Sequence, residues 1–396
     1  MSTNAKTTVG LLALCQAFFT SSSSIMALTT GLVGFQFLGE DTTLATVPVS
    51  AMVIGTAIAT APASMIMKRV GRRWGFTIGA LIGVLGAAIA ALSVWQLSFW
   101  GFSFGILLMG MYNGFSHYYR FAAADVSSEK FRSRAISLVL FGGVVAAFVG
   151  PEIALRTADL VPGAQFLGTY LAVIALVTVS IVLIQFIRIP APTVAERTET
   201  GRPMSEIMRQ PKFIVAVLSS MIGFAVMVLL MTATPIAMVE QFNHALRDAK
   251  TVIQWHALAM FAPSFVTGML IARFGVLNII AMGVVFMIGS IVFAVTGVAF
   301  LNFWAALFLL GLGWNFMFVG GSSLLTETYE PAERAKAQGF HDFMVFGLVA
   351  LASLSSGALL QLLSWRAVSY GAVPFLIVVS LALLWLVLRR PAPAQA

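Results

Sequence analysis

The sequence is poor in charged residues and in cysteine, and both shortages narrow the class of protein. Asp, Glu, Lys and Arg make up only 10% of the 396 residues, against about 25% in an ordinary soluble domain. The hydrophobic content is 59% and the mean hydropathy is +0.96, which excludes a soluble domain of this size. The single cysteine, Cys15, excludes a disulfide framework and a cysteine metal cluster.

The motifs of enzymes and of ATP-driven pumps are also missing. No Gly-rich phosphate loop ends in Gly-Lys-Ser or Gly-Lys-Thr, so we do not expect ATP-driven transport by this chain. The four histidines are too scattered for a metal pair, and we expect neither an enzyme nor a bound metal or cofactor. No basic stretch alternates with aromatic residues, so the net charge of +8 does not indicate nucleic-acid binding.

The sequence contains instead about twelve long apolar runs, each sufficient to cross a hydrocarbon core of about 30 Å. In lipid every backbone N–H and C=O must be paired within the protein, so runs of this length must be helices. We therefore predict an all-α membrane protein with spans near 9–36, 43–67, 75–96, 98–124, 133–156, 163–188, 212–239, 250–272, 276–299, 301–326, 335–364 and 366–389.

The basic residues predict how these spans are oriented. With a cytoplasmic N-terminus, 18 of the 23 Lys and Arg residues fall on the cytoplasmic face. Only Arg156, Arg247, Lys250 and Arg366 fall on the other face, and Arg120 lies within a span. This distribution follows the positive-inside rule, so we predict that both termini are cytoplasmic.

One long polar stretch divides the chain into two related parts. We predict a six-helix bundle over 1–189, a cytoplasmic linker over 190–211 and a second six-helix bundle over 212–396. A weak repeat at an offset of 202 residues supports the division, since it aligns Asn113 with Asn315. Two such halves with a site between them are typical of alternating-access carriers. They favour moving parts over the static pore of a channel.

The two hinges carry a resemblance to a known family. The stretch Lys68–Arg73 resembles the hinge signature of the major facilitator superfamily, with Lys68 where that family has an acid, and Gly268–Gly275 is similar to its second copy. Gly150-Pro151 is similar to the core of a motif found in many proton-driven exporters of that family. The resemblance implies twelve transmembrane helices in two pseudo-symmetric bundles and a monomeric secondary transporter of a small organic solute in the bacterial inner membrane.

Three further stretches point to a branch within this family. Gly313–Phe316, Leu324–Tyr329 and Ala335–Gly339 resemble a bacterial branch that includes riboflavin uptake carriers. The resemblance implies uptake of a heteroaromatic nutrient such as riboflavin. The alternative is a proton-driven antiporter that exports drugs or toxic metabolites, which Gly150-Pro151 favours.

We single out five ionisable residues that lie away from the ends of the predicted spans, where a charge costs about 2.5–3.5 kcal/mol on insertion scales. We expect an inner cluster of Arg120 with His341 and Asp342, and an outer pair of Glu152 with His256. They are candidates for gating or for coupling to H⁺, and Glu152 is the first of them because a carboxyl within a span can switch between its protonated and ionised forms. The alternative is that they are structural ion pairs between helices.

Matched acids at the hinges predict a conformational latch. Asp125 is placed to receive Arg69 or Arg72 in the first half, and Glu327 to receive Arg273 in the second. The alternative, anchoring by the positive-inside rule, explains the basic residues but not the two acids.

The family resemblance implies that the first, fourth, seventh and tenth spans line the solute cavity. Amides and hydroxyls there suit an uncharged polar solute, and aromatic residues beside them suit a planar heteroaromatic one. The alternative is that the hydroxyl and small residues pack helices together. The candidate solute-binding residues are Gln16, Tyr112, Asn113, His117, Thr232, Trp314 and Asn315.

Overall fold

The computed structural model describes residues 3–38, 44, 47–191, 193, 199 and 201–389, and these residues form helices joined by short turns. Their contacts divide the chain into two compact units. The first unit contains Met1–Gly201 and Pro331–Ala350, and the second contains Arg202–Glu330 and Leu351–Ala396. The boundaries inferred from the polar linker, at 189 and 212, stay a prediction, since this division follows contacts within the chain.

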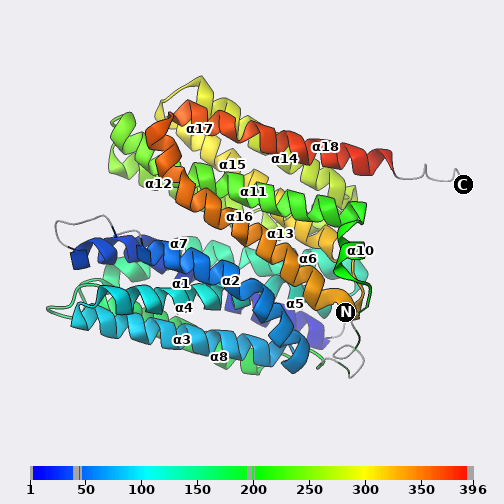
Figure 1. The fold of residues 1–396 in the computed structure, drawn as a ribbon, viewed down its shortest axis with the longest axis horizontal. Helices are drawn as coiled ribbons and strands as arrows, with labels where there is room; N and C mark the ends of the chain where they lie inside the picture. Colours follow the sequence, from blue (N-terminus) through cyan, green and yellow to red (C-terminus); the bar gives the residue numbers. More distant parts are fainter. Residues whose placement is uncertain are drawn as a thin grey trace, which may run out of the picture. The chain divides into compact units, whose positions relative to one another are not determined.

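The first unit is a bundle of long helices (Figure 1). It comprises α1 (Thr3–Leu38), α2 (Val47–Val70), α3 (Arg72–Gln96), α4 (Phe99–Ser116), α5 (Tyr119–Asp125), α6 (Glu129–Phe141), α7 (Gly143–Thr157), α8 (Leu167–Gln185), the 3-10 turn η3 (Pro331–Glu333) and the first part of α16 (Arg334–Leu362). Helix α4 packs closely on α2 and α3. A Cβ atom at Gly110 would collide with the carbonyl oxygen of Met52, so α2 and α4 approach this closely only because position 110 is glycine.

The second unit has the same kind of architecture. It comprises α10 (Met204–Met208), α11 (Pro211–Ile236), the π-helical turn η2 (Ala237–Gln241), α12 (Leu246–Phe261), α13 (Ser264–Phe274), α14 (Val276–Thr296), α15 (Phe300–Leu325), the second part of α16, α17 (Trp365–Gly371) and α18 (Val373–Leu388). Helix α15 is its central element and packs on α11, α12 and α14.

The two hinge glycines adopt the same backbone conformation. Gly71 joins α2 to α3 with φ 87°, and Gly275 joins α13 to α14 with φ 85°. A positive φ of this size costs little only for glycine. The hinge repeat recognised in the sequence is therefore also a repeat of backbone geometry.

Ten of the described helices are long and apolar enough to cross a membrane, and a bent pair brings the number to eleven. The bent pair is α12 with α13, which meet at 42° beside Pro263. The predicted span 98–124 is divided between α4 and α5, and α4 is not among the ten helices. It is apolar along most of its length, carries Tyr112 and Asn113 near its end and stops at Ser116.

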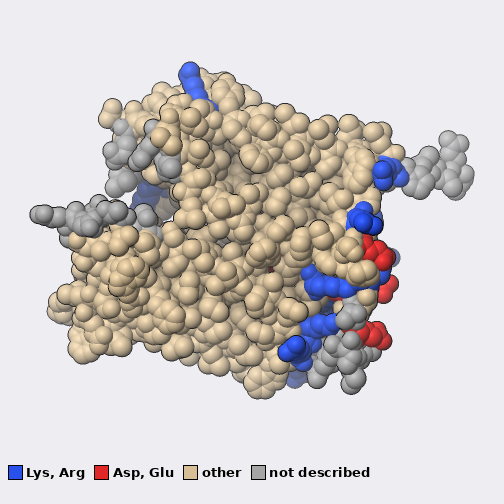
Figure 2. Space-filling view, in the orientation of Figure 1, with Lys and Arg blue, Asp and Glu red and all other residues tan. Residues whose placement is uncertain are grey.

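Many helices of the described chain carry large apolar side chains on their outer sides. Large residues such as Leu85, Val285 and Leu381 are more than half exposed, and Figure 2 shows wide surfaces without charge and basic side chains gathered near helix ends. Exposed apolar surface on this scale suits a hydrocarbon environment, not water.

Candidate functional site

A break between α4 and α5 sets the position of a buried arginine. The backbone leaves the helix at His117 and Tyr118, and Arg120 follows in the first turn of α5. One Nη of Arg120 donates to the carbonyl oxygen of His117, and the other donates to Oδ1 of Asp342 at 2.6 Å. The side chains of Arg120 and Asp342 are 1% and 0% exposed. The predicted contact between the fourth and eleventh spans is thus present in the first unit.

Asp342 is also in contact with its neighbour His341. Nδ1 of His341 lies 2.7 Å from the same Oδ1 that receives Arg120. The second carboxylate oxygen, Oδ2, and Nε2 of His341 are both buried and have no hydrogen-bond partner among the described residues. A carboxylate with one unused oxygen beside an imidazole with one unused nitrogen can accept or release a proton.

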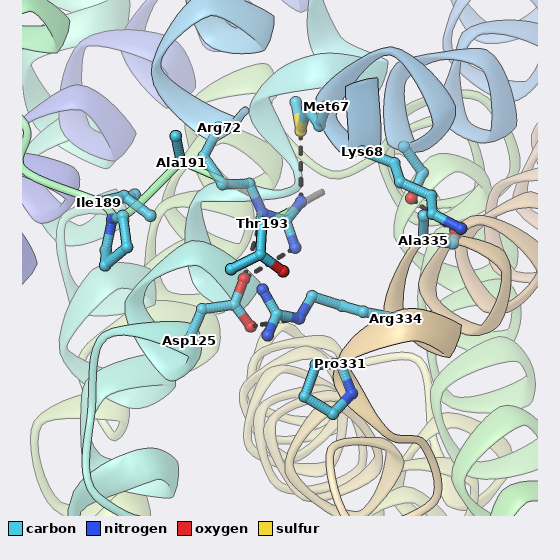
Figure 3. Close-up of a pocket in the computed structure, with 12 residues that line it drawn as sticks. Met67, Lys68, Arg72, Asp125, Ile189, Ala191, Thr193, Pro331, Arg334 and Ala335 are labelled. Atoms are coloured by element: carbon cyan, nitrogen blue, oxygen red, sulfur yellow. Dashed lines mark hydrogen bonds and ion pairs between the residues drawn. The ribbon is translucent and has the colours of Figure 1, made fainter. Parts of the chain in front are cut away.

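A second ion-pair network surrounds Asp125 (Figure 3). Nε and Nη2 of Arg72 donate to Oδ2 of Asp125 at 3.1 and 3.0 Å, and Nε of Arg334 lies 3.5 Å from Oδ1. Nη2 of Arg72 also donates to Oε1 of Gln338 at 2.6 Å. Of the two predicted partners of Asp125, Arg72 makes the contact and Arg69 is exposed. Arg69 lies in the last turn of α2, whereas Arg72 begins α3 beyond the Gly71 turn.

The Asp125 network lines a cavity of about 340 Å³ within the first unit. Its wall includes Lys68, Arg72 and Arg334 (Figure 3). Beside it the hydroxyl of Ser64 donates to the carbonyl oxygen of Ala335 at 2.7 Å, which joins α2 to the first turn of α16. The start of α16 is therefore held to the helices of the first unit by neutral hydrogen bonds as well as by ion pairs.

The acid of the second half has a different partner from the predicted one. Glu327 pairs with Lys212, at the start of α11, at 2.8 Å, and both side chains are nearly half exposed. Arg273 is exposed at the end of α13, and its guanidinium lies 5.2 Å from the ring centroid of Phe274. The expected contact of Glu327 with Arg273 is therefore replaced by a surface ion pair.

The two members of the predicted outer pair have local partners. Glu152 receives Nε of Arg156 at 2.6 Å, four residues along α7, and its side chain is 55% exposed. Glu152, which the sequence places within a span, is thus more than half exposed, and the next turn of its own helix supplies the counter-charge. His256 is buried, and its Nδ1 lies 2.7 Å from the carbonyl oxygen of Leu307.

Two of the predicted solute residues of the first unit, Tyr112 and His117, contact Phe19 of α1. The Phe19 ring is edge-on to Tyr112 and His117, at centroid distances of 5.8 and 5.4 Å. His117 stacks on Phe346 at 4.0 Å. Sequence reasoning missed Phe19 and Phe346, since a phenylalanine in an apolar span carries no signal that separates a binding residue from a packing residue.

The amides near these rings come from α1 and α4. Gln16 donates to the hydroxyl of Thr20 at 3.0 Å, within α1. Ser23 donates to Oδ1 of Asn113 at 3.3 Å, and this is the single hydrogen bond of the Asn113 side chain among the described residues.

The predicted solute residues of the second unit are more firmly bound to the protein. Asn315 is fully buried, and its Nδ2 donates to the carbonyl oxygen of Met260 and to Oγ of Ser264, both at 2.6 Å. Its Oδ1 accepts from Thr267 at 2.7 Å. These three partners flank the break between α12 and α13, so the structure gives Asn315 the role of holding that bend.

The two other candidates of the second unit differ in burial. Trp314 is buried and stacks on Phe318 at 5.1 Å, with Phe224 and Phe261 edge-on. Thr232 is half-buried on α11.

The helical bundles, the long apolar helices and the hinge repeat are those of a multi-pass membrane protein built from two related halves. Residues 10–286 and 217–396 match the model of the Major Facilitator Superfamily, and the chain belongs to that superfamily of secondary transporters. The family resemblance seen in the sequence is confirmed.

Relatives and solved structures agree with this assignment. The chain is 41% identical over 397 residues to the riboflavin transporter RfnT of Brucella anthropi, covering 100% of this chain and 98% of the relative. It is 29% identical over 373 residues to the MFS-type transporter YdeG of Bacillus subtilis, covering 89% and 85%.

Two solved structures share the fold at low sequence identity. The fucose:proton symporter FucP of E. coli has a TM-score of 0.76 at 16% identity, covering 95% of this chain and 98% of that one. The human organic anion transporter MFSD10 has a TM-score of 0.75 at 11% identity, covering 96% and 100%. At these identities the likeness shows the fold alone.

Proposed function

We propose that this carrier takes up riboflavin or a closely related heteroaromatic nutrient. The observation that carries the proposal is the 41% identity to a riboflavin transporter over the full length of both chains. The site in the first unit supports it, since the half-buried aromatic ring of His117 follows four residues after Asn113, whose side chain makes one hydrogen bond among the described residues. Stacking with a few directional hydrogen bonds suits a planar heteroaromatic ring.

Riboflavin binding and uptake by the purified protein test this proposal. Stacking on aromatic side chains quenches flavin fluorescence, so a titration in detergent should show saturable quenching. Proteoliposomes should take up riboflavin, and excess unlabelled riboflavin should compete where fucose does not. Active protein that shows no saturable riboflavin binding, and transports lipophilic cations outward instead, would replace the proposal with the export alternative.

We further propose that uptake is coupled to protons through Asp342 and His341. The support is geometric: both side chains are buried, and each has one polar atom without a protein partner. The groups that face Asp342 are Arg120, His341, His117 and Tyr118. Arg120 and the ring of Phe121 face His341. Protonation of Asp342 would weaken its pair with Arg120, which gives the proton a means to change the contact between α5 and α16.

A comparison of two transport modes tests the coupling. In Asp342→Asn proteoliposomes, a proton gradient should no longer drive riboflavin accumulation, whereas exchange of riboflavin across the membrane should continue. His341→Gln should reduce accumulation less, because the carboxylate and Arg120 remain. Gradient-driven accumulation that persists in Asp342→Asn would refute this site.

The cellular setting follows from the same family assignment. We propose a monomer in the bacterial inner membrane with both termini cytoplasmic, since 18 of the 23 Lys and Arg residues lie on the face assigned to the cytoplasm. A fluorescent protein that folds only in the cytoplasm, fused after Ala396, should be fluorescent. Light scattering of the detergent complex should give the mass of one chain.

A further inference from the structure

We propose that Asn113 recognises the imide edge of the solute's ring system and that His117 supports the ring beside it. The inference rests on the proposed uptake of riboflavin, whose isoalloxazine carries an imide, C(=O)–N–H–C(=O), on its pyrimidine ring. It names the side chain that distinguishes this ring from other planar aromatic solutes.

Burial of the Asn113 side chain costs free energy, and the described residues satisfy little of its hydrogen-bonding capacity. Its side chain is 8% exposed in a membrane-spanning segment, where an unpaired amide is unfavourable. Its one bond is the long 3.3 Å contact from Ser23 to Oδ1, and Nδ2 has no partner among the described residues. An amide left in this condition is available to a ligand.

The chemistry of an amide matches that of an imide. A primary amide offers one acceptor oxygen and an NH₂ donor side by side. Oδ1 of Asn113 can accept from the imide N–H while Nδ2 donates to the adjacent imide carbonyl. Two parallel hydrogen bonds of this kind fix both the position and the direction of the ring.

The neighbours of Asn113 provide the surface for the ring. His117 lies four residues further along the chain, so both side chains project from the same side of the α4 terminus. The His117 ring is half-buried, is stacked on Phe346 at 4.0 Å and makes no hydrogen bond among the described residues. Because Phe19 also lies edge-on to His117 at 5.4 Å, it is the part of this ring left exposed that can contact a planar ligand beside Asn113.

The amide at the repeated position provides a contrast. Asn315 uses its oxygen and both of its N–H groups in bonds of 2.6–2.7 Å to the protein. Of the two aligned amides, only Asn113 has hydrogen-bonding capacity left for a solute.

The test combines a chemically modified ligand with a substituted residue. Riboflavin and 3-methylriboflavin differ at the imide nitrogen, where the methyl group replaces the hydrogen. We expect the wild-type carrier to bind riboflavin about tenfold more tightly than 3-methylriboflavin. Asn113→Ala should weaken riboflavin binding by a similar factor and abolish the preference. Asn315→Ala, the matched control, should keep the preference in whatever fraction is folded.

The outcomes separate this inference from the proposed function. Wild-type protein that binds riboflavin and 3-methylriboflavin equally overturns the recognition of the imide and leaves riboflavin uptake standing. Wild-type protein that binds neither overturns both. The wild-type comparison needs no variant, so the test stands even where Asn113→Ala fails to fold. A preference that survives in folded Asn113→Ala assigns the imide to another residue.

Discussion

The segment α4–α5 and the helix α15 carry the same sequence pattern but have different roles in the structure. Each has a buried Asn followed twelve residues later by an acid, Asn113 with Asp125 and Asn315 with Glu327. In the first segment the amide is nearly unbonded and the acid is buried between arginines. In the second, the amide is saturated and the acid lies in an exposed ion pair.

The location of the helix breaks explains this difference. In the first unit the break lies within the segment itself, at His117 and Tyr118, and α2 stays continuous through Pro62. In the second unit α15 is continuous, and the neighbouring span is broken beside Pro263. There Nδ2 of Asn315 donates a hydrogen bond to the carbonyl oxygen of Met260. A sequence repeat therefore marks equivalent positions and not equivalent roles.

The largest expected effect comes from Arg120, which has no charged counterpart in α15. Arg120→Ala would leave the buried carboxylate of Asp342 without its cation, so we expect the free energy of unfolding to fall by about 3–5 kcal/mol. Thermal or denaturant unfolding in detergent measures this. Ser322→Ala, at the matched position of α15, should cost far less, and equal losses would contradict the comparison.

Asn315→Ala should affect stability more than Asn113→Ala does, whereas Asn113→Ala should affect solute binding more. Asn315→Ala removes the partners of the Met260 carbonyl and of two hydroxyls, so we expect unfolding to become easier by about 3 kcal/mol. Asn113→Ala should change the unfolding free energy by less than about 0.5 kcal/mol. If Asn113→Ala is the more destabilising variant, the amide at 113 is structural.

The two acids form a third pair. Asp125→Asn weakens three contacts from Arg72 and Arg334, and we expect a loss of about 2 kcal/mol. Glu327→Gln removes an exposed ion pair and should lower the free energy of unfolding by about 0–1 kcal/mol. This loss should become smaller at high salt, because salt already screens the pair. A larger loss for Glu327→Gln in the same unfolding assay would show that the second latch is the stronger one.

The hinge glycines should behave alike, because their backbone angles agree. Gly71→Ala and Gly275→Ala each place a Cβ atom on a residue with positive φ and an extended ψ, at a cost of about 1–3 kcal/mol. At Gly275 no other atom lies within 4 Å of the added Cβ, so the backbone term stands alone there. Unfolding losses that differ strongly between the two variants would show that the hinges are not equivalent in energy.

The sequence predicted which residues belong to the site better than it predicted which of them pair with each other. The cluster of Arg120, His341 and Asp342 could be predicted from depth along two spans. Opposite charges at the same depth are expected to pair, because an unpaired charge in the membrane interior is unfavourable. The same reasoning placed Glu152 with His256, which stays a prediction, and it did not foresee that Arg156, one turn along the same helix, pairs with Glu152.

The sequence by itself determined the class, the helical spans, the hinge repeat and the residues whose burial needs an explanation. These follow from hydropathy and from the need to pair every backbone group in lipid, and both are properties of the chain alone. The tertiary structure decided that Arg72 and not Arg69 meets Asp125, that Lys212 replaces Arg273, and that Asn113 keeps a free amide. Such choices depend on which helix faces are turned toward each other, and hydrogen bonds of about 3 Å are sensitive to rotations that composition and periodicity do not record.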